Sequence, residues 1–162
     1  LLLCWGNSGC KGPYQIRDNG LSYLSLGAPM PETGTVRLKR LPVRDTVFFE
    51  NDFTWRASVI KYPVGKVYVE SDFLGQETVN RIRIQSPDLQ LDKQFSVGDP
   101  ITGLTSWAEV WDLTYLEDYG VYDLVAIDRP SVHFLVKSAQ AQTLKGPADF
   151  PATARIYAIV IM

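Results

Sequence analysis

Few side chains in this sequence could perform nucleophilic or metal chemistry: there is one histidine, His133, and there are two cysteines, Cys4 and Cys10. Zinc needs three or four nitrogen and sulfur ligands at suitable spacing, which the chain does not supply. No G-x-S-x-G motif marks a nucleophilic serine, and no glycine-rich loop has the spacing that cradles phosphate. The sequence therefore predicts neither a metal nor a cofactor. We expect His133 to be a strand residue with a hydrogen-bonding neighbour.

Acidic side chains are the remaining candidates for chemistry. A facing pair of carboxylates can hydrolyse a glycosidic bond, one as the acid and the other as nucleophile or base. The densest acidic group comprises Asp112, Glu117, Asp118 and Asp123. Such a group is more typical of a solvated rim, so the sequence favours a protein without a catalytic site.

The element that would position these carboxylates is a helix predicted at 106–119. Ser106 and Glu109 have the spacing of a capping box, no proline or glycine interrupts the segment, and Gly120 could end it in a left-handed conformation. Large rings recur at intervals of four, which places them on one side of such a helix. We expect these rings to pack in the core first and to form an interaction surface second. They are Trp107, Trp111, Tyr115 and Tyr119, joined by Tyr122.

The rest of the chain alternates apolar and polar residues, as strands with one buried face do. The expected strands comprise 35–40, 46–49, 53–60, 65–70, 78–85, 133–136 and 156–161. Strands that are half exposed to solvent form antiparallel sheets. We therefore predict an α+β fold, a mostly antiparallel sheet with one main helix packed on it.

Two short segments resemble each other across the chain: LGAPM at 26–30 and VGDPI at 97–101. The strand at 67–70 likewise resembles 134–137. These echoes indicate that the fold could consist of two diverged tandem repeats. Chance similarity between short strands is the alternative.

Length and composition bound the class of protein. The chain has 162 residues, of which 46% are hydrophobic and 21% charged, enough for one buried core. We predict a single domain at 13–162, with possible halves at 13–75 and 76–162. The formal net charge is −2 and no cation run exceeds Lys39-Arg40. Nucleic acid is not an expected partner, because its phosphates need clustered cations.

Residues 1–12 have the pattern of a signal-peptide remnant followed by a linker. Ser8-Gly9-Cys10 resembles the end of a bacterial lipobox, in which the cysteine thiol receives a lipid, although Asn7 stands where leucine is typical. Cys10 is therefore the expected lipid attachment site. No later segment approaches the roughly 18 to 20 consecutive apolar residues that span a bilayer, so the lipid is the only membrane contact we expect.

Three motifs occur in order between residues 65 and 140: Ile82-Arg83-Ile84-Gln85-Ser86-Pro87, Val97-Gly98-Asp99, and Tyr119-Gly120 at the end of the predicted helix. This order is similar to that of small uncharacterised bacterial envelope lipoproteins. Their sheet-and-helix units resemble the β-lactamase inhibitor protein and the small lipoprotein of the outer-membrane barrel-assembly machinery. The resemblance implies a periplasm-facing or surface lipoprotein with an interaction role, and it carries over no catalytic residue.

Together these features predict a non-catalytic, lipid-anchored protein of the bacterial cell envelope. It would act as a protein-interaction or scaffold module with an envelope protein as its partner. The first alternative is a small-molecule or glycan binding protein that uses the sheet and the aromatic rings. Its mark would be a pocket lined by Trp or Tyr with a few converging polar groups. The second alternative is a glycan-acting hydrolase with a carboxylate pair.

Overall fold

The computed structural model describes residues 15–31, 37–38, 41–50 and 53–162; the segment predicted at 1–12, with Cys10, lies outside them. The described strands are β1 (Gln15–Arg17), β2 (Gly20–Leu21), β3 (Leu24–Ser25), β4 (Arg37–Leu38), β5 (Leu41–Glu50), β6 (Phe53–Lys61), β7 (Lys66–Ser71), β8 (Val79–Gln85), β9 (Gln90–Leu91), β10 (Trp111–Leu116), β11 (Val121–Ala126), β12 (Val132–Lys137) and β13 (Ile156–Ile161). Three short 3-10 helices accompany them: η1 (Ile101–Ser106), η2 (Glu117–Tyr119) and η3 (Pro147–Asp149). None of the helices in these described ranges has the length and apolar character needed to cross a membrane.

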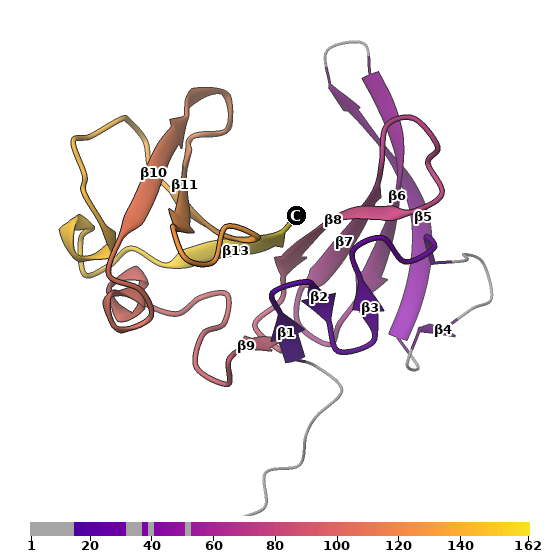
Figure 1. The fold of residues 1–162 in the computed structure, drawn as a ribbon, viewed down its shortest axis with the longest axis horizontal. Coiled ribbons are helices and arrows are strands. Elements are labelled where there is room, and N and C mark those ends of the chain that lie inside the picture. The colour runs from indigo at the N-terminus through magenta and orange to yellow at the C-terminus, as the bar shows by residue number, and fades with distance from the viewer. Residues whose placement is uncertain (1–14, 32–36, 39–40, 51–52) are drawn as a thin grey trace, which may run out of the picture.

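Nine strands form one antiparallel sheet in the order β10-β11-β12-β13-β8-β7-β6-β5-β4. Strands β5 to β8 follow one another as a meander, and β10 to β13 form a second meander. The two meanders join where β8 pairs with β13. The sheet therefore has two arms, which Figure 1 shows on either side of the C-terminus. The predicted mostly antiparallel sheet is confirmed.

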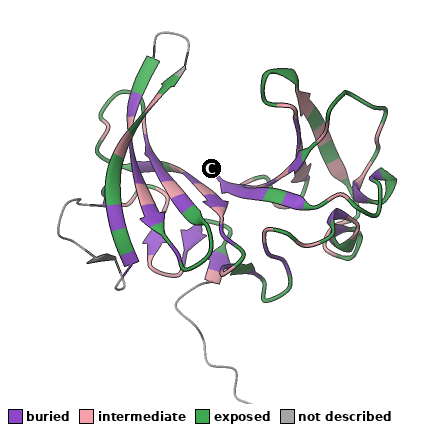
Figure 2. Cartoon of the chain, turned by 180° about the vertical axis from the view of Figure 1, so that it is seen from behind, coloured by how far each residue is buried: buried purple, intermediate pink, exposed green. Residues whose placement is uncertain are grey.

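One face of this sheet carries the core. Along β8, Ile82 and Ile84 are fully buried, whereas Arg81 and Arg83 on the alternate positions stay partly exposed. The buried face packs with a small sheet of order β3-β2-β1-β9, whose Leu21 belongs to the same hydrophobic cluster. Figure 2 shows the buried residues along the strands of both arms. The opposite face of the sheet is left to line the space between the arms.

The helix predicted at 106–119 is not formed, and the described residues contain no α-helix. The predicted α+β class is thereby corrected to a β fold with short 3-10 turns, because most of that segment is β10 and η2. An interval of four residues returns to nearly the same side of a helix, but four is also an even number of strand steps. Within β10 the rings of Trp111 and Tyr115 are half-buried and Asp112 is exposed, so the segment follows the two-residue period. Six residue pairs with β11 hold it in the sheet.

The two end signals of the predicted helix serve neighbouring turns instead. The Ser106 hydroxyl donates to the carbonyl of Gly103, 3.0 Å away, at the end of η1. Gly120 adopts a left-handed conformation with φ of 59° and ends η2. The need for a left-handed residue at 120 was therefore visible in the sequence, although the element that it ends is a single 3-10 turn.

Two glycines make the same contact in the two halves of the chain. The Gly27 N–H donates to the carbonyl of Val79, and the Gly98 N–H donates to the carbonyl of Ile156, each at 2.8 Å. Both glycines have positive φ, 75° and 95°, where a Cβ would be strained. The segments at 26–30 and 97–101 thus lie beside the first residue of the last strand of each meander, Val79 of β8 and Ile156 of β13.

Strands β8 and β13 correspond position by position. Val79 and Ile156, which begin them, are 77 residues apart, and the same offset relates Arg83 to Val160. Arg83 and Val160 are themselves paired where the two strands meet. A local two-fold relationship therefore passes between these two residues. The division into halves predicted at 13–75 and 76–162 stays a prediction.

The correspondence extends to the next strands. Glu70 of β7 lies opposite Arg81, and Leu135 of β12 lies opposite Ala158, the position 77 residues after Arg81. In both pairs of strands the register shifts immediately afterwards, between residues 70 and 71 and between 135 and 136. Three positions of the first arm, 70, 81 and 83, thus correspond to 135, 158 and 160 of the second.

Candidate functional site

A cleft of about 520 Å³ lies between the two arms of the sheet. Strand β8 contributes Arg81 and Arg83 to it, because these side chains alternate with the buried isoleucines of the same strand. Trp55 lines it from the first arm, and Leu135 and Tyr157 line it from the second. The cleft depends on the β8–β13 junction, since this junction brings residues from two distant parts of the chain to one surface.

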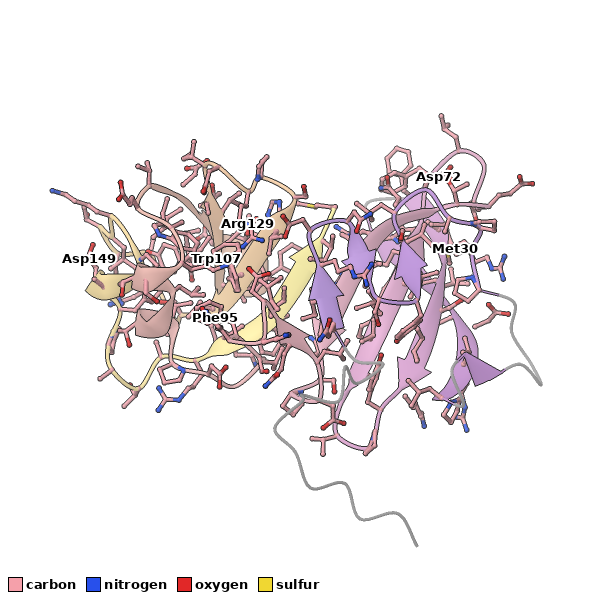
Figure 3. All side chains as sticks on the ribbon, turned by 60° about the horizontal axis from the view of Figure 1, so that its bottom comes forward. Met30, Asp72, Phe95, Trp107, Arg129 and Asp149 are labelled. Carbon is pink, nitrogen blue, oxygen red and sulfur yellow. The ribbon has the colours of Figure 1, made fainter. Side chains whose placement is uncertain are left out.

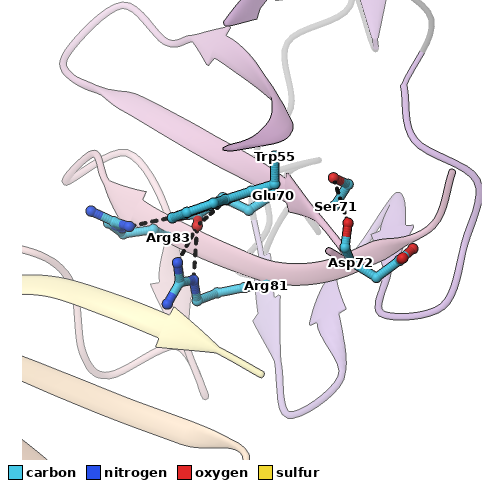
Figure 4. Close-up of polar contacts among 6 residues, drawn as sticks. All are labelled: Trp55, Glu70, Ser71, Asp72, Arg81 and Arg83. Atoms are coloured by element: carbon cyan, nitrogen blue, oxygen red, sulfur yellow. Dashed lines mark hydrogen bonds and ion pairs between the residues drawn. The ribbon is translucent and has the colours of Figure 1, made fainter. Parts of the chain in front are cut away.

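Glu70 lies beside these arginines and is the one buried charged side chain in the part of the chain that the structure describes, with 1% exposed. Its Oε2 accepts from Nε of Arg81 at 2.9 Å and also from Nη2 of that residue, while Oε1 accepts from Nη2 of Arg83 at 2.8 Å. The indole Nε1–H of Trp55 donates to Oε2 at 3.2 Å (Figure 4). Such charge-assisted hydrogen bonds compensate the cost of removing a carboxylate from water.

Both guanidinium groups also lie over aromatic rings. The guanidinium carbon of Arg83 lies 5.3 Å from the ring centre of Phe48 and 5.9 Å from that of Tyr68. That of Arg81 lies 6.0 Å from the ring centre of Trp55. Each such contact contributes about 0.5–1 kcal/mol at an exposed site. Both cations are thus fixed in the cleft before any ligand enters, which lowers the entropy cost of binding.

The second arm presents a different wall. His133 Nδ1 lies 2.9 and 3.0 Å from the two carboxylate oxygens of Asp123, and both residues line the cleft. An ionised carboxylate only accepts, so Nδ1 carries the hydrogen in this pair. The strand position and the neighbour expected for His133 are both found. Of the acidic group noted in the sequence, Asp112, Glu117 and Asp118 are exposed outside the cleft lining.

In the described ranges, no group of three or more His, Cys, Asp or Glu is placed to hold a metal ion.

A second hollow, of about 480 Å³, has Lys137 and Arg155 in its lining. The Lys137 ammonium lies 4.3 Å from the ring centre of Tyr157, and Arg155 Nη1 donates to the carbonyls of Ala152 and Ala154. The cleft between the arms is the candidate site, because two guanidinium groups that a buried carboxylate orients converge there among aromatic rings.

No family model and no curated protein matches this chain. The fold resembles that of the uncharacterized protein yfeY from Escherichia coli. The two chains are 13% identical, the match covers 91% of this chain and 98% of that chain, and the TM-score is 0.58. At this identity the likeness shows a shared fold alone. The resemblance to the β-lactamase inhibitor protein and to the barrel-assembly lipoprotein stays a prediction.

The structure divides the predicted aromatic set into three places. Trp107 and Trp111 are partly buried and pack against each other and against Phe134 of the core, with ring centres 5.1–6.1 Å apart. Tyr115 and Tyr122 form a separate pair, with ring centres 5.0 Å apart. They pack on the same core cluster, and Tyr122 is 3% exposed.

Tyr119 alone of this set reaches the cleft. It lies in η2 with 61% of its surface exposed and lines the wall of the second arm. The aromatic residues that the structure brings to the cleft are otherwise ones that the sequence analysis did not single out, among them Trp55 and Tyr157. The sequence did carry a signal for the charged group of the cleft: 67–70 reads Val-Tyr-Val-Glu, with a carboxylate at the end of an apolar strand, and Arg81 and Arg83 alternate in the next strand.

A polar cluster around Arg129 links the two halves away from the cleft. The Arg129 guanidinium lies 4.4 Å from the ring centre of Trp107 (Figure 3). It pairs with Asp18, at 2.9 Å, and with Asp92. The Trp107 indole donates to Asp92 at 2.9 Å. The hydrogen bond from Arg129 lowers the pKa of Asp92, and Asp92 in turn raises the pKa of Arg129. This cluster is structural, because it connects the turn after β1 with the second half.

Proposed function

We propose that this protein is a non-catalytic binding protein that takes up a small ligand in the cleft between the arms. One observation carries the proposal: a buried carboxylate fixes two partly exposed guanidinium groups in a concave surface that tryptophan and tyrosine rings line. Binding sites for small molecules are concave and largely apolar, with a few fixed polar groups that converge on the ligand. The volume of about 520 Å³ lies within the usual range of such sites, about 300–1,000 Å³.

Binding is favoured over hydrolysis by the arrangement of the carboxylates. Hydrolysis of a glycosidic bond needs two carboxylates that face each other across the substrate. Among the described residues that line the cleft, Asp123 is the one carboxylate, and it is bonded to His133. Glu70 is enclosed by its own hydrogen bonds to Arg81 and Arg83.

The proposal places the protein in the bacterial cell envelope, facing the periplasm or the outside, with a lipid on Cys10. The Ser8-Gly9-Cys10 pattern supports this location. Metabolic labelling of the full-length precursor with palmitate in a bacterial host tests it. Label on the wild type and none on Cys10→Ala is the expected result; label on neither would remove the anchor.

A protein-interaction or scaffold role is the second candidate, and a different surface favours it. Phe53 and Phe73 stack edge to face with ring centres 6.3 Å apart, and both are more than half exposed. Leu74, which follows Phe73 in the chain, is 99% exposed. Exposed apolar groups of this size often mark a protein contact. Crosslinking in native envelopes tests this role. The wild type should be crosslinked to a specific protein partner, and the variants Phe53→Ser and Leu74→Ser should lose that crosslink.

The ligand-binding role is tested with phenylnaphthylamine, a neutral apolar dye whose fluorescence rises in an apolar site. We expect saturable binding at one site per chain. Leu135→Gln keeps the side-chain volume but puts an amide on the wall of the cleft, so it should weaken dye binding by about tenfold. Ile127→Gln makes the same kind of change at a residue that is 60% exposed outside the cleft lining, and binding should not change. Equal effects of the two substitutions would contradict the proposal.

A further inference from the structure

The cations of the cleft are only partly neutralised by the chain itself. Two guanidinium groups face one carboxylate, so Arg81, Arg83 and Glu70 together carry a net charge of +1. Glu70 engages Nε and Nη2 of Arg81 and Nη2 of Arg83. Because each guanidinium has five N–H donors, both side chains retain donors for a further acceptor. Both also line the cleft.

The second arm shows that the sheet does not need this charged group. The positions that correspond to Glu70, Arg81 and Arg83 hold Leu135, Ala158 and Val160. The same strand pairing and the same register shift form there with apolar side chains. A buried ion pair generally adds little to stability compared with well-packed apolar residues. The charged group therefore has a different use, and its place in the cleft indicates recognition of a ligand.

The two sets of side chains lie next to each other. Arg83 is paired with Val160 across the β8–β13 junction, and the Cβ atoms of residues paired in this way are about 5 Å apart. An anionic group bound at Arg83 would therefore have Val160 beside it, and Leu135 and Tyr157 continue the wall of the same cleft. Asp123 stands on β11, three strand spacings from β8, or about 14 Å. Its negative charge keeps an anion at the arginine side.

We propose that the cleft binds a small amphipathic anion, with its charged group on Arg81 and Arg83 and its apolar body on the second arm. This inference rests on the proposed ligand-binding function and names the class of ligand. Carboxylate, sulfonate and phosphate groups all suit the two guanidinium groups, whose planar N–H pairs match their oxygens. A neutral ligand of the same shape would leave these donors without an acceptor and would bind more weakly.

Two dyes of nearly the same shape test the inference. Anilinonaphthalene sulfonate carries an anionic group that phenylnaphthylamine lacks. Wild-type protein should bind the anionic dye at least about tenfold more tightly, as expected for charge-assisted hydrogen bonds. Added salt should weaken binding of the anionic dye only. Arg44→Gln, which removes an exposed cation outside the cleft lining, should change neither affinity.

Two variants make the test specific. The exchange Glu70→Leu, Arg81→Ala and Arg83→Val installs the side chains of the second arm, so it should keep the fold and the binding of the neutral dye. It should lose the preference for the anionic dye. Arg83→Gln leaves Glu70 bonded to Arg81 and Trp55 and should reduce binding of the anionic dye about tenfold. If the exchanged protein did not fold, this single variant would decide.

The outcomes separate the two proposals. Wild-type protein that binds both dyes equally would overturn the inference and leave the ligand-binding function standing. Retained preference for the anionic dye in the folded variants would also overturn the inference, because the charge would then be recognised elsewhere. Wild-type protein that binds neither dye would overturn the ligand-binding function and the inference with it.

Discussion

Arg83 and Val160 face each other across the junction of β8 and β13. They are also equivalent positions: Arg83 has the same place in the first arm as Val160 has in the second. The centre of the cleft is therefore asymmetric although the strands around it correspond. One side holds a cation that a buried carboxylate orients, and the other holds an aliphatic side chain. Residues of one arm can be placed in the other as matched substitutions, because the backbone pairing is the same in both.

The first prediction concerns the stability of the charged group. Arg81→Ala removes two hydrogen bonds from a carboxylate that is 1% exposed, so it should lower the free energy of unfolding by about 3 kcal/mol. The threefold exchange to Leu, Ala and Val removes the buried charge as well and should stay within about 1 kcal/mol of the wild type. Urea unfolding followed by tryptophan fluorescence measures both. If the triple variant were as unstable as Arg81→Ala, the stability of the sheet would depend on the ion pairs.

The strands of the first meander, together with β12 and β13 of the second, could be predicted from the sequence, because a buried face imposes a two-residue period. Strand β11 was not predicted, and β10 fell within the predicted helix. The segment from Trp107 to Tyr119 misled the prediction for a physical reason. Its ring spacing fits both a helix and a strand, and the pairing with β11 that decides between them is not visible locally. The alternation of Asp112 and Thr114 with apolar neighbours was the better signal.

The internal echo shows a related limit. The sequence aligns 67–70 with 134–137, but sheet pairing places Val67 opposite Ile84 and Val132 opposite Ile161. The correspondence is thus offset by two residues from the one that the sequence indicates. A shift of two keeps every side chain on its face of the sheet, so alternation cannot detect it. The glycines at 27 and 98 are free of this ambiguity, because a positive φ marks a single position.

The cleft could not be predicted from any one segment. Glu70, Arg81 and Leu135 come from three strands, and the β8–β13 junction joins these strands in one sheet. Each residue alone is an ordinary strand residue. The carboxylate at the end of an apolar strand was a local hint, since a buried charge needs partners.

The second prediction concerns Asp72, which organises the loop between β7 and β8. Its Oδ1 accepts from the backbone N–H groups of Leu74, Gly75 and Gln76, and its Oδ2 accepts from the Thr78 hydroxyl. These bonds, that of Gly75 above all, lower its pKa to about 2 from an ordinary 3.8. The ionised group therefore stabilises the fold above pH 3.8, and this contribution is lost as the pH falls toward 2.

Asp72→Asn removes the charge and should lower the Tm at neutral pH. The difference from the wild type should narrow between pH 3.8 and 2, because the wild type loses the same charge there. Thermal unfolding at a series of pH values measures this, with Asp128→Asn as the control at another exposed aspartate. A difference that stayed constant down to pH 2 would contradict the assignment.

The third prediction concerns the Arg129 cluster. Arg129→Gln should lower the free energy of unfolding by about 1–2 kcal/mol, because it removes a cation–π contact with Trp107 and the ion pairs with Asp18 and Asp92. The part due to the ion pairs should shrink in molar salt, whereas the ring contact should persist. Urea unfolding at low and high salt separates the two parts. If Asp18→Asn and Arg129→Gln were both neutral, the cluster would not join the halves.

The last prediction separates Tyr119 from Tyr122, two rings of the aromatic set that the sequence placed together. Tyr122 is buried, and its hydroxyl donates to the carbonyl of Gln142 at 2.7 Å and accepts from the N–H of that residue. Tyr122→Ala should therefore cost about 3 kcal/mol or more of stability, through the cavity and the lost hydrogen bonds. Tyr119→Ala should change stability by less than about 0.5 kcal/mol, because the ring is 61% exposed. Binding of the dyes should respond in the opposite order, since Tyr119 lines the cleft and Tyr122 does not. Urea unfolding and dye titration on the same two variants give both readings. A Tyr119 variant that lost stability and kept its affinity would remove that residue from the binding site.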